Sequence, residues 1–126
     1  MNYVNIVAIL AVLQFFLFGL YVGRARQRYG VKAPATTGNE HFERAFRVQM
    51  NTMEQLVCFL PSLFIAALYW PNAVVAAIGV VWVLGRFIYR HSYVADPSKR
   101  FIGFLLTIVP MFILLGLGLF GSVVGR

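Results

Sequence analysis

Long uncharged apolar runs alternate with short polar segments along this chain of 126 residues. A helix that crosses a membrane needs ~20 residues, and each run is at least that long. The run at 55–85 is broken at Trp70-Pro71-Asn72, where the proline ends one helix and the next one starts. The pattern therefore predicts one all-α domain, 1–126, an integral membrane four-helix bundle. Its helices are expected at about 3–28, 40–69, 73–94 and 97–124.

Composition supports a membrane protein. The chain is 60% hydrophobic and 12% charged, with a mean hydropathy of +0.77. The net charge of +7 has the sign for nucleic-acid binding, but the basic residues are confined to two connections between apolar runs, so no nucleic-acid partner is expected. A single cysteine, Cys58, excludes an intrachain disulfide and is expected to be packed and inert. His41 and His91 are isolated, so no metal site is predicted.

The basic residues also predict the topology. All Lys and Arg residues except Arg126 lie within 24–47 or 86–100. By the positive-inside rule these two regions face the cytoplasm, and both termini face the opposite side. The expected location is a bacterial inner membrane or the endoplasmic reticulum, with the basic connections in contact with lipid headgroups.

A polar stretch, FERAFRVQMNTME at 42–54, leads directly into the second apolar run. On a helix, Arg47, Asn51 and Glu54 share one face because they are spaced i, i+4, i+7. Asn51 and Glu54 lie within the ~20 residues that precede the turn, so they are at membrane depth. Polar side chains at that depth indicate a functional site.

Equal distances from the turn place further polar residues at the same depth on the next helix. Glu54 lies 18 residues before Asn72 and Arg90 lies 18 after it, next to Tyr89; Asn51 and Tyr93 are each 21 residues away. Because all helices rise by ~1.5 Å per residue, equal counts mean similar depths. Asn51, Glu54, Tyr89 and Tyr93 can therefore converge on one cleft.

Arg100 is expected in the first turn of the fourth helix, which Asp96 caps and Pro97 begins. A cation is structurally unfavourable there, but an arginine at a helix N-terminus stabilises an anion such as a thiolate. A purely structural interpretation stays open. Glu54 could neutralise Arg86 or Arg90, and Glu40 and Glu43 stand i, i+4 before Arg44 and Arg47.

Two motifs resemble a known family, the membrane-associated proteins in eicosanoid and glutathione metabolism. FERAFRVQMNTMEQ resembles the family's E-R-x-x-R-x-Q-x-N-x-x-E element, and GRFIYRHSYVADPSKR resembles its R-x-x-Y-x-x-x-Y-x-x-x-x-x-x-R element. Within this family, the chain resembles the branch that contains the leukotriene C synthase and the microsomal glutathione transferases. The resemblance implies a homotrimer that binds glutathione, as co-substrate, between subunits on the cytoplasmic side.

The resemblance also implies the site residues. One subunit would bind glutathione through Arg47, Asn51, Glu54, Tyr89, Tyr93 and Arg100, with Arg100 activating the thiol. Arg26 and Gln49 would come from the neighbouring subunit. Gln49 is ~200° round the helix from Arg47, which agrees with a role in a different subunit.

Two positions depart from the family's leukotriene synthase. Gln55 stands where that enzyme has a tyrosine, and Gln27 where it has an arginine thought to assist the lipid epoxide. Both weaken an expectation of leukotriene synthesis and leave the glutathione site largely intact. Arg28 is close to Gln27 and is a possible substitute for the missing arginine.

The expected function is a membrane-bound glutathione transferase that conjugates the thiolate to lipophilic electrophiles, with glutathione peroxidase activity as a further possibility. Two alternatives stay open. One is a non-enzymatic lipid-binding accessory protein of the same fold, against which the arginines, Glu54 and Tyr93 argue. The other is a small multidrug transporter, a class that needs an acidic residue in its first helix; residues 1–23 contain none.

Overall fold

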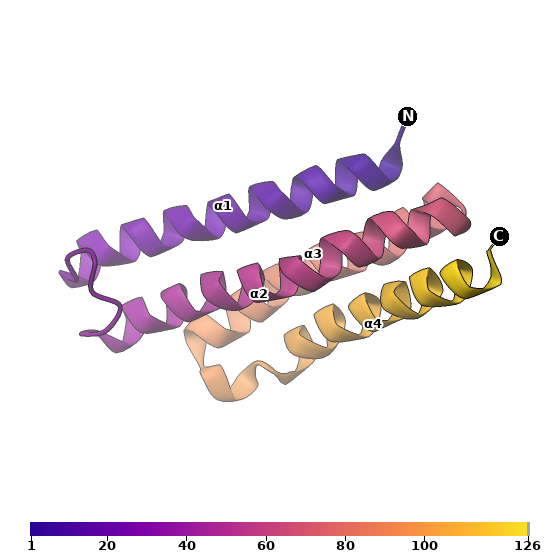
Figure 1. The fold of residues 1–126 in the computed structure, drawn as a ribbon. Helices are drawn as coiled ribbons and strands as arrows, with labels where there is room; N and C mark the ends of the chain where they lie inside the picture. The colour runs from indigo at the N-terminus through magenta and orange to yellow at the C-terminus, as the bar shows by residue number, and fades with distance from the viewer. Residues whose placement is uncertain (126) are drawn as a thin grey trace.

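The computed structural model describes residues 1–125 as four long helices with short connections (Figure 1). All four are long and apolar enough to cross a membrane. The predicted all-α four-helix membrane architecture is therefore confirmed. The elements are α1 at Tyr3–Tyr29, α2 at Glu40–Tyr69, α3 at Asn72–Ala95, the short 3-10 helix η1 at Pro97–Lys99, and α4 at Phe101–Val124.

The helices α1 and α4 lie on opposite sides of the hairpin formed by α2 and α3 (Figure 1). The bundle has two distinct ends. The tight turn between α2 and α3 and both chain termini lie at one end, which we call the hairpin end. The α1–α2 and α3–α4 connections, residues 30–39 and 96–100, lie at the other, which we call the connection end.

Helix boundaries at the connection end follow from local chemistry. Gly30 ends α1 in the left-handed conformation, with φ of 70°, and its N–H donates to the Arg26 carbonyl. This conformation favours glycine because a Cβ is disfavoured there. Asn39 begins α2, since its Oδ1 accepts hydrogen bonds from the backbone N–H groups of His41 and Phe42 at 2.9 and 3.1 Å.

The start of the fourth helix was predicted wrongly. Asp96 and Pro97 begin the separate η1 turn, and α4 starts only at Phe101. Asp96 Oδ1 accepts hydrogen bonds from the Ser98 N–H at 3.1 Å and the Ser98 hydroxyl at 2.8 Å. Asp96 and Pro97 do cap and begin a helix, but that helix is the short η1 turn and not α4. Arg100 consequently precedes α4 instead of lying within its first turn.

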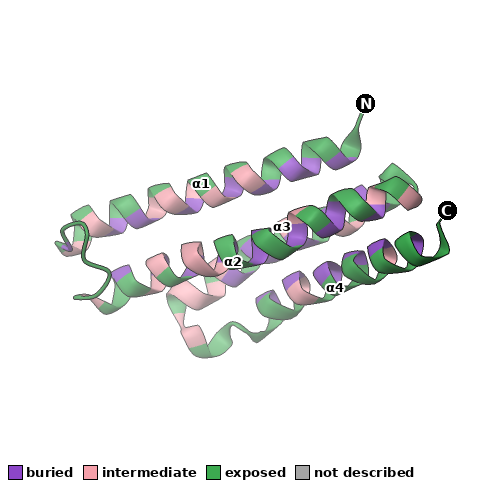
Figure 2. Ribbon diagram, in the orientation of Figure 1, coloured by how far each residue is buried: buried purple, intermediate pink, exposed green. Residues whose placement is uncertain are grey.

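Toward the hairpin end the helices are held by apolar packing. The Phe59 and Trp82 rings stack with centroids 4.1 Å apart, and Leu63 and Val75 are fully buried. Figure 2 shows buried residues where helices face each other and exposed residues on the outer surfaces. Cys58, expected to be packed inside, lies on this outer surface instead.

Helices α3 and α4 approach each other most closely through glycines. A Cβ at Gly85 would lie 2.8 Å from the backbone of Leu106, and one at Gly103 would lie 2.4 Å from the Tyr89 Cα. Nothing larger than glycine fits such a contact without moving a helix. This close approach places the start of α4, and with it Arg100, beside Tyr89.

Candidate functional site

Arg47 and Glu54 form an ion pair along one face of α2, with 3.1 Å between Nη2 and Oε1. The face predicted from their spacing is therefore real. Their side chains are 50% and 55% exposed. An ion pair in such contact with solvent adds only ~0–1 kcal/mol to stability. The pair therefore presents one cation and one anion to a ligand at little structural cost.

Asn51, on the same helix, is held by an arginine of α3. Arg86 Nη2 donates to Asn51 Oδ1 at 2.9 Å and to Thr52 Oγ1 at 2.8 Å. Arg86 is fully buried. The alternative pairing of Glu54 with Arg86 or Arg90 is not formed, because Glu54 pairs with Arg47.

The buried charge of Arg86 is stabilised by neutral groups. Its guanidinium carbon lies 4.4 Å from the Tyr89 ring centroid and 5.9 Å from that of Trp82. Cation–π attraction is strongest where water is excluded, as it is here. Its Nε and Nη1 have no hydrogen-bond partner among the described residues. Arg86 thus joins α2 to α3 and contacts both Asn51 and Tyr89.

Tyr89 and Tyr93 stack with centroids 5.5 Å apart. The Tyr89 phenol also interacts electrostatically with Arg47 and Arg100, which places one residue of α2 and one preceding α4 around it. Tyr93 and Arg47 together line a cavity of about 460 Å³ at the connection end. Asn51, Glu54, Tyr89 and Arg100 do not line that cavity.

Arg100 lies at the mouth of a separate hollow of about 480 Å³, together with Ser98, Phe101 and Phe104. Its Nη1 donates to the Pro97 carbonyl at 2.9 Å, and the residue is exposed. The guanidinium keeps other N–H donors for a ligand. The apolar side chains beside it, Phe101 and Phe104, are exposed on the outer surface.

Arg26 and Gln49 face away from this group. Arg26 Nη1 donates to the Ala35 carbonyl at 2.7 Å, and its guanidinium lies over the Phe42 ring. Gln49 packs toward α1, where its Nε2 would be 2.7 Å from a Cβ at Gly19. Within one chain the structure therefore does not bring these two residues to Arg47. Their proposed role in a neighbouring subunit stays a prediction.

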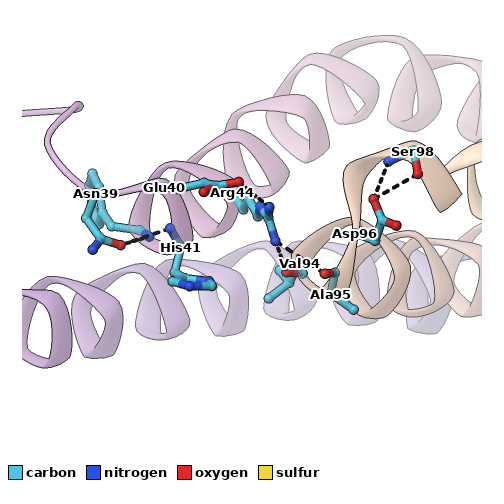
Figure 3. Close-up of polar contacts among 9 residues, drawn as sticks. Asn39, Glu40, His41, Arg44, Val94, Ala95, Asp96 and Ser98 are labelled. Carbon is cyan, nitrogen blue, oxygen red and sulfur yellow. Dashed lines mark hydrogen bonds and ion pairs between the residues drawn. The ribbon is translucent and has the colours of Figure 1, made fainter.

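Arg44 fastens α2 to the end of α3, a role that the sequence did not indicate. Its Nη1 donates to the Val94 and Ala95 carbonyls, both at 3.2 Å, and its Nη2 pairs with Glu40 (Figure 3). The last carbonyls of a helix have no partner within it, and a cation suits that end of the dipole. The contact holds the start of α2 against the end of α3, next to Tyr93.

Asp96 lies at the same junction. The Ser98 side chain and backbone N–H donate to its carboxylate, which lowers the pKa of Asp96 below its ordinary value; the nearby Lys99 and Arg44 act in the same direction. Hydrogen bonds to a carboxylate favour its charged form. Asp96 is therefore a charged anchor of η1 (Figure 3).

Two buried residues near the site were given no role from the sequence. Thr52 was not considered, although it is fully buried and bonded to Arg86. Gln55, noted only as a departure from the family pattern, is 9% exposed, and its Oε1 accepts no hydrogen bond from the described residues. Two further polar side chains of the motif are therefore buried beside the site residues.

Comparisons with known proteins find relatives over most of the chain. The model of the MAPEG family matches residues 4–120. The chain is similar to an uncharacterized protein of Synechocystis, with 48% identity over 80% of this chain and 74% of the relative. It is 37% identical to human microsomal glutathione S-transferase 2 over 91% of this chain and 78% of that protein. Its identity to leukotriene C4 synthase of Cavia porcellus is 33%, over 91% and 77%. The match over nearly all of the chain shows that this membrane protein belongs to the MAPEG family.

Proposed function

We propose that the protein is a glutathione transferase of the membrane, which joins the glutathione sulfur to lipophilic electrophiles. The observation that carries the proposal is the half-exposed Arg47–Glu54 pair, with its two charges 3.1 Å apart. Glutathione carries two carboxylates and one ammonium group. A cation and an anion fixed side by side complement such a zwitterion, and neither is committed to holding the fold.

Each side chain of the site has its own role in binding glutathione. Arg47 donates charge-assisted hydrogen bonds to a glutathione carboxylate, and Glu54 accepts from the ammonium group. Asn51, held by Arg86, contributes its amide, and the Tyr89–Tyr93 stack forms the wall beside it. We further propose that three copies of the chain assemble, so that Arg26 and Gln49 of a neighbouring copy complete the site.

Arg100 favours the thiolate form of the bound glutathione. An ordinary thiol has a pKa of ~8.5, so little thiolate exists at neutral pH unless a cation stabilises it. The thiolate sulfur attacks the electrophilic carbon of the second substrate, forming a carbon–sulfur bond. Either a halide leaves, or an epoxide C–O bond opens and its oxygen takes up a proton from solvent.

The second substrate reaches the sulfur from the membrane. Phe101 and Ile102 follow Arg100 directly and are 63% and 64% exposed. They provide an apolar approach beside the reactive group. A peroxidase reaction uses the same thiolate. The sulfur attacks a peroxide oxygen, the O–O bond breaks, and an alcohol leaves while the glutathione becomes a sulfenic acid. The thiol of a second glutathione then displaces water from the sulfenic acid and forms glutathione disulfide.

The test is conjugation of an aromatic halide by purified protein, comparing wild type with Arg100→Ala and Lys99→Ala. Lys99 is the matched control because it is an exposed cation one residue away. We expect kcat/KM to fall ~100-fold or more in Arg100→Ala, the size typical of losing a transition-state charge partner, and to stay near wild type in Lys99→Ala. Wild-type turnover in Arg100→Ala would refute the role of Arg100, and absence of glutathione binding by the wild type would refute the function.

A further inference from the structure

A further cavity lies outside the site described above. Its volume is about 590 Å³, and it lies between the end of α1, the start of α2 and the end of α3. None of the eight residues proposed to bind glutathione lines it. The lining residues are Tyr21, Arg24, Ala25, Gln27, Arg28, Tyr29, His41, Ala45, Arg90 and Val94.

Three arginines share this cavity without a counter-charge. Arg24 and Arg28 lie on successive turns of α1, and Arg90 faces them from α3, close enough for its charge and that of Arg24 to repel. No carboxylate lines the cavity. The two ion pairs of the described residues use Arg44 and Arg47. Positive charges held together in this way favour binding of an anion.

The position of Arg90 is fixed, while its hydrogen-bond donors stay free. Its guanidinium carbon lies 3.8 Å from the Tyr21 ring centroid, a stacked contact, and 6.0 Å from that of Phe18. Stacking holds the plane of an arginine without using its N–H groups. Arg24, Arg28 and Arg90 donate no hydrogen bond to another described residue. Guanidinium groups of this kind match phosphate oxygens in geometry and charge.

The surroundings of the cavity indicate where its anion comes from. Tyr21, Ala25 and Val94 line it on helices that are long and apolar enough to cross a membrane. The arginines come at the connection end of the same helices, where a span reaches the headgroup layer. Apolar and cationic groups side by side suit a phosphate that is joined to lipid chains.

We propose that this cavity binds the phosphodiester headgroup of an anionic membrane lipid between Arg24, Arg28 and Arg90. The lipid chains extend along the exposed apolar surface of α1 and α3. This inference is independent of the transferase reaction, because it uses none of the residues assigned to glutathione.

The test is native mass spectrometry of the detergent-solubilised wild-type protein with added phosphatidylglycerol or phosphatidylcholine. We expect phosphatidylglycerol to be retained at lower lipid concentration than phosphatidylcholine. The variants are Arg90→Gln and the double variant Arg24→Gln/Arg28→Gln. Each lost charge should weaken phosphatidylglycerol binding roughly fivefold, as for a basic residue at an anionic surface.

Lys32→Gln is the matched control, since it removes an exposed cation of the adjacent α1–α2 connection that does not line the cavity. It should bind phosphatidylglycerol as the wild type does. Equal weakening in Lys32→Gln would reduce the effect to general surface charge and overturn the site. Displacement of the lipid by inorganic phosphate at millimolar concentration would overturn its assignment to a lipid. The single variant Arg24→Gln changes an exposed position, so its fold is preserved, and its conjugation rate should equal that of the wild type.

Discussion

Helix α4 packs against a different neighbour at each end of the bundle. At the connection end, Gly85 of α3 lies against the α4 backbone at Leu106, and Gly103 of α4 lies against the α3 backbone at Tyr89. At the hairpin end, Gly118 brings α4 against α2, where a Cβ would meet a methyl group of Ile65 at 3.2 Å. The Ile65 methyl group can shift by a few tenths of an ångström, whereas backbone contacts cannot adjust. Gly121, also at the hairpin end, has no such freedom, because an added Cβ would lie 2.5 Å from the Tyr69 Cβ.

The polar contacts differ between the two ends in the same way. Arg86, Arg44 and Arg100 all donate to oxygen atoms toward the connection end. Toward the hairpin end Phe59 and Leu63 pack as apolar side chains, and the Trp70 indole donates to the Leu117 carbonyl at 2.9 Å. The difference indicates that the connection end is built for fixed geometry. The hairpin end is built for burial of apolar surface, where substitutions of similar volume are tolerated better.

The largest expected effect is that of Gly103→Ala. Its Cβ would lie 2.4 Å from the Tyr89 Cα, so α4 has to move away from α3. We expect a loss of ~3 kcal/mol or more, at the upper end for overpacking, together with lower conjugation activity, because Arg100 moves with α4. Thermal unfolding in detergent measures the first effect and turnover the second.

Two substitutions in the same helix calibrate this result. Gly118→Ala should cost ~1 kcal/mol or less, since one methyl group yields. Gly116→Ala should be neutral, because a Cβ there meets nothing within 4 Å. If all three variants unfolded at the same temperature, the distinction between rigid and adjustable contacts would be wrong.

Arg86→Gln should have the next largest effect. It leaves Asn51 and Thr52 without their shared donor in a buried setting, for an expected loss of ~2 kcal/mol. The KM for glutathione should also rise, because Asn51 is no longer held. Arg90→Gln is the control on the same helix, since Arg90 donates no hydrogen bond to another described residue and should cost less. A double-mutant cycle between Arg86→Gln and Asn51→Ala should show coupling, and additive effects would contradict the link.

Glu54→Gln should affect binding without affecting stability. Its ion pair with Arg47 is half exposed, so unfolding should change by less than ~1 kcal/mol. The KM for glutathione should rise ~10-fold, because the ammonium group loses a charged partner. Glu40→Gln is the matched control: it removes the other acid of an ion pair in α2, and its KM should stay unchanged. Equal KM values in the two variants would contradict the assigned role of Glu54.

Asp96→Asn should have the smallest effect, and that effect should disappear in acid. The pKa of Asp96 is lowered in the folded protein by the hydrogen bonds from Ser98. A depressed pKa contributes stability that is present above the unfolded value of ~3.9 and is lost as the pH falls through the folded pKa. Wild type should therefore exceed Asp96→Asn in unfolding temperature at neutral pH, and the difference should disappear in acid. A difference that grows with falling pH would have the wrong sign.

Much of the fold could be predicted from the sequence. Uncharged runs and Pro71 fixed the number of helices, and the spacing of Arg47 and Glu54 identified a face that does carry an ion pair. The start of α4 could not be predicted in this way, because Asp96-Pro97 is an equally good start for a short turn and for a long helix.

The role of Arg86 was missed for a different reason. Counting residues from the turn compares Cα depths, and Arg86 lies 14 residues from Asn72 while Asn51 lies 21. The long arginine side chain bridges that difference, which no count of helix rise includes. The hydrogen bonds of Arg44 could not be predicted, because the Val94 and Ala95 carbonyls that accept them lie about 50 residues further along the chain.

The most direct test of the central claim is the ultraviolet absorbance of thiolate when glutathione binds to purified protein at neutral pH. The wild type should show a thiolate signal that saturates with glutathione, because Arg100 stabilises the anion. Arg100→Ala should still bind glutathione through Arg47 and Glu54 but give no such signal. An equal thiolate signal in both proteins would contradict the proposed role of Arg100, and no saturable signal in the wild type would contradict the proposed glutathione site.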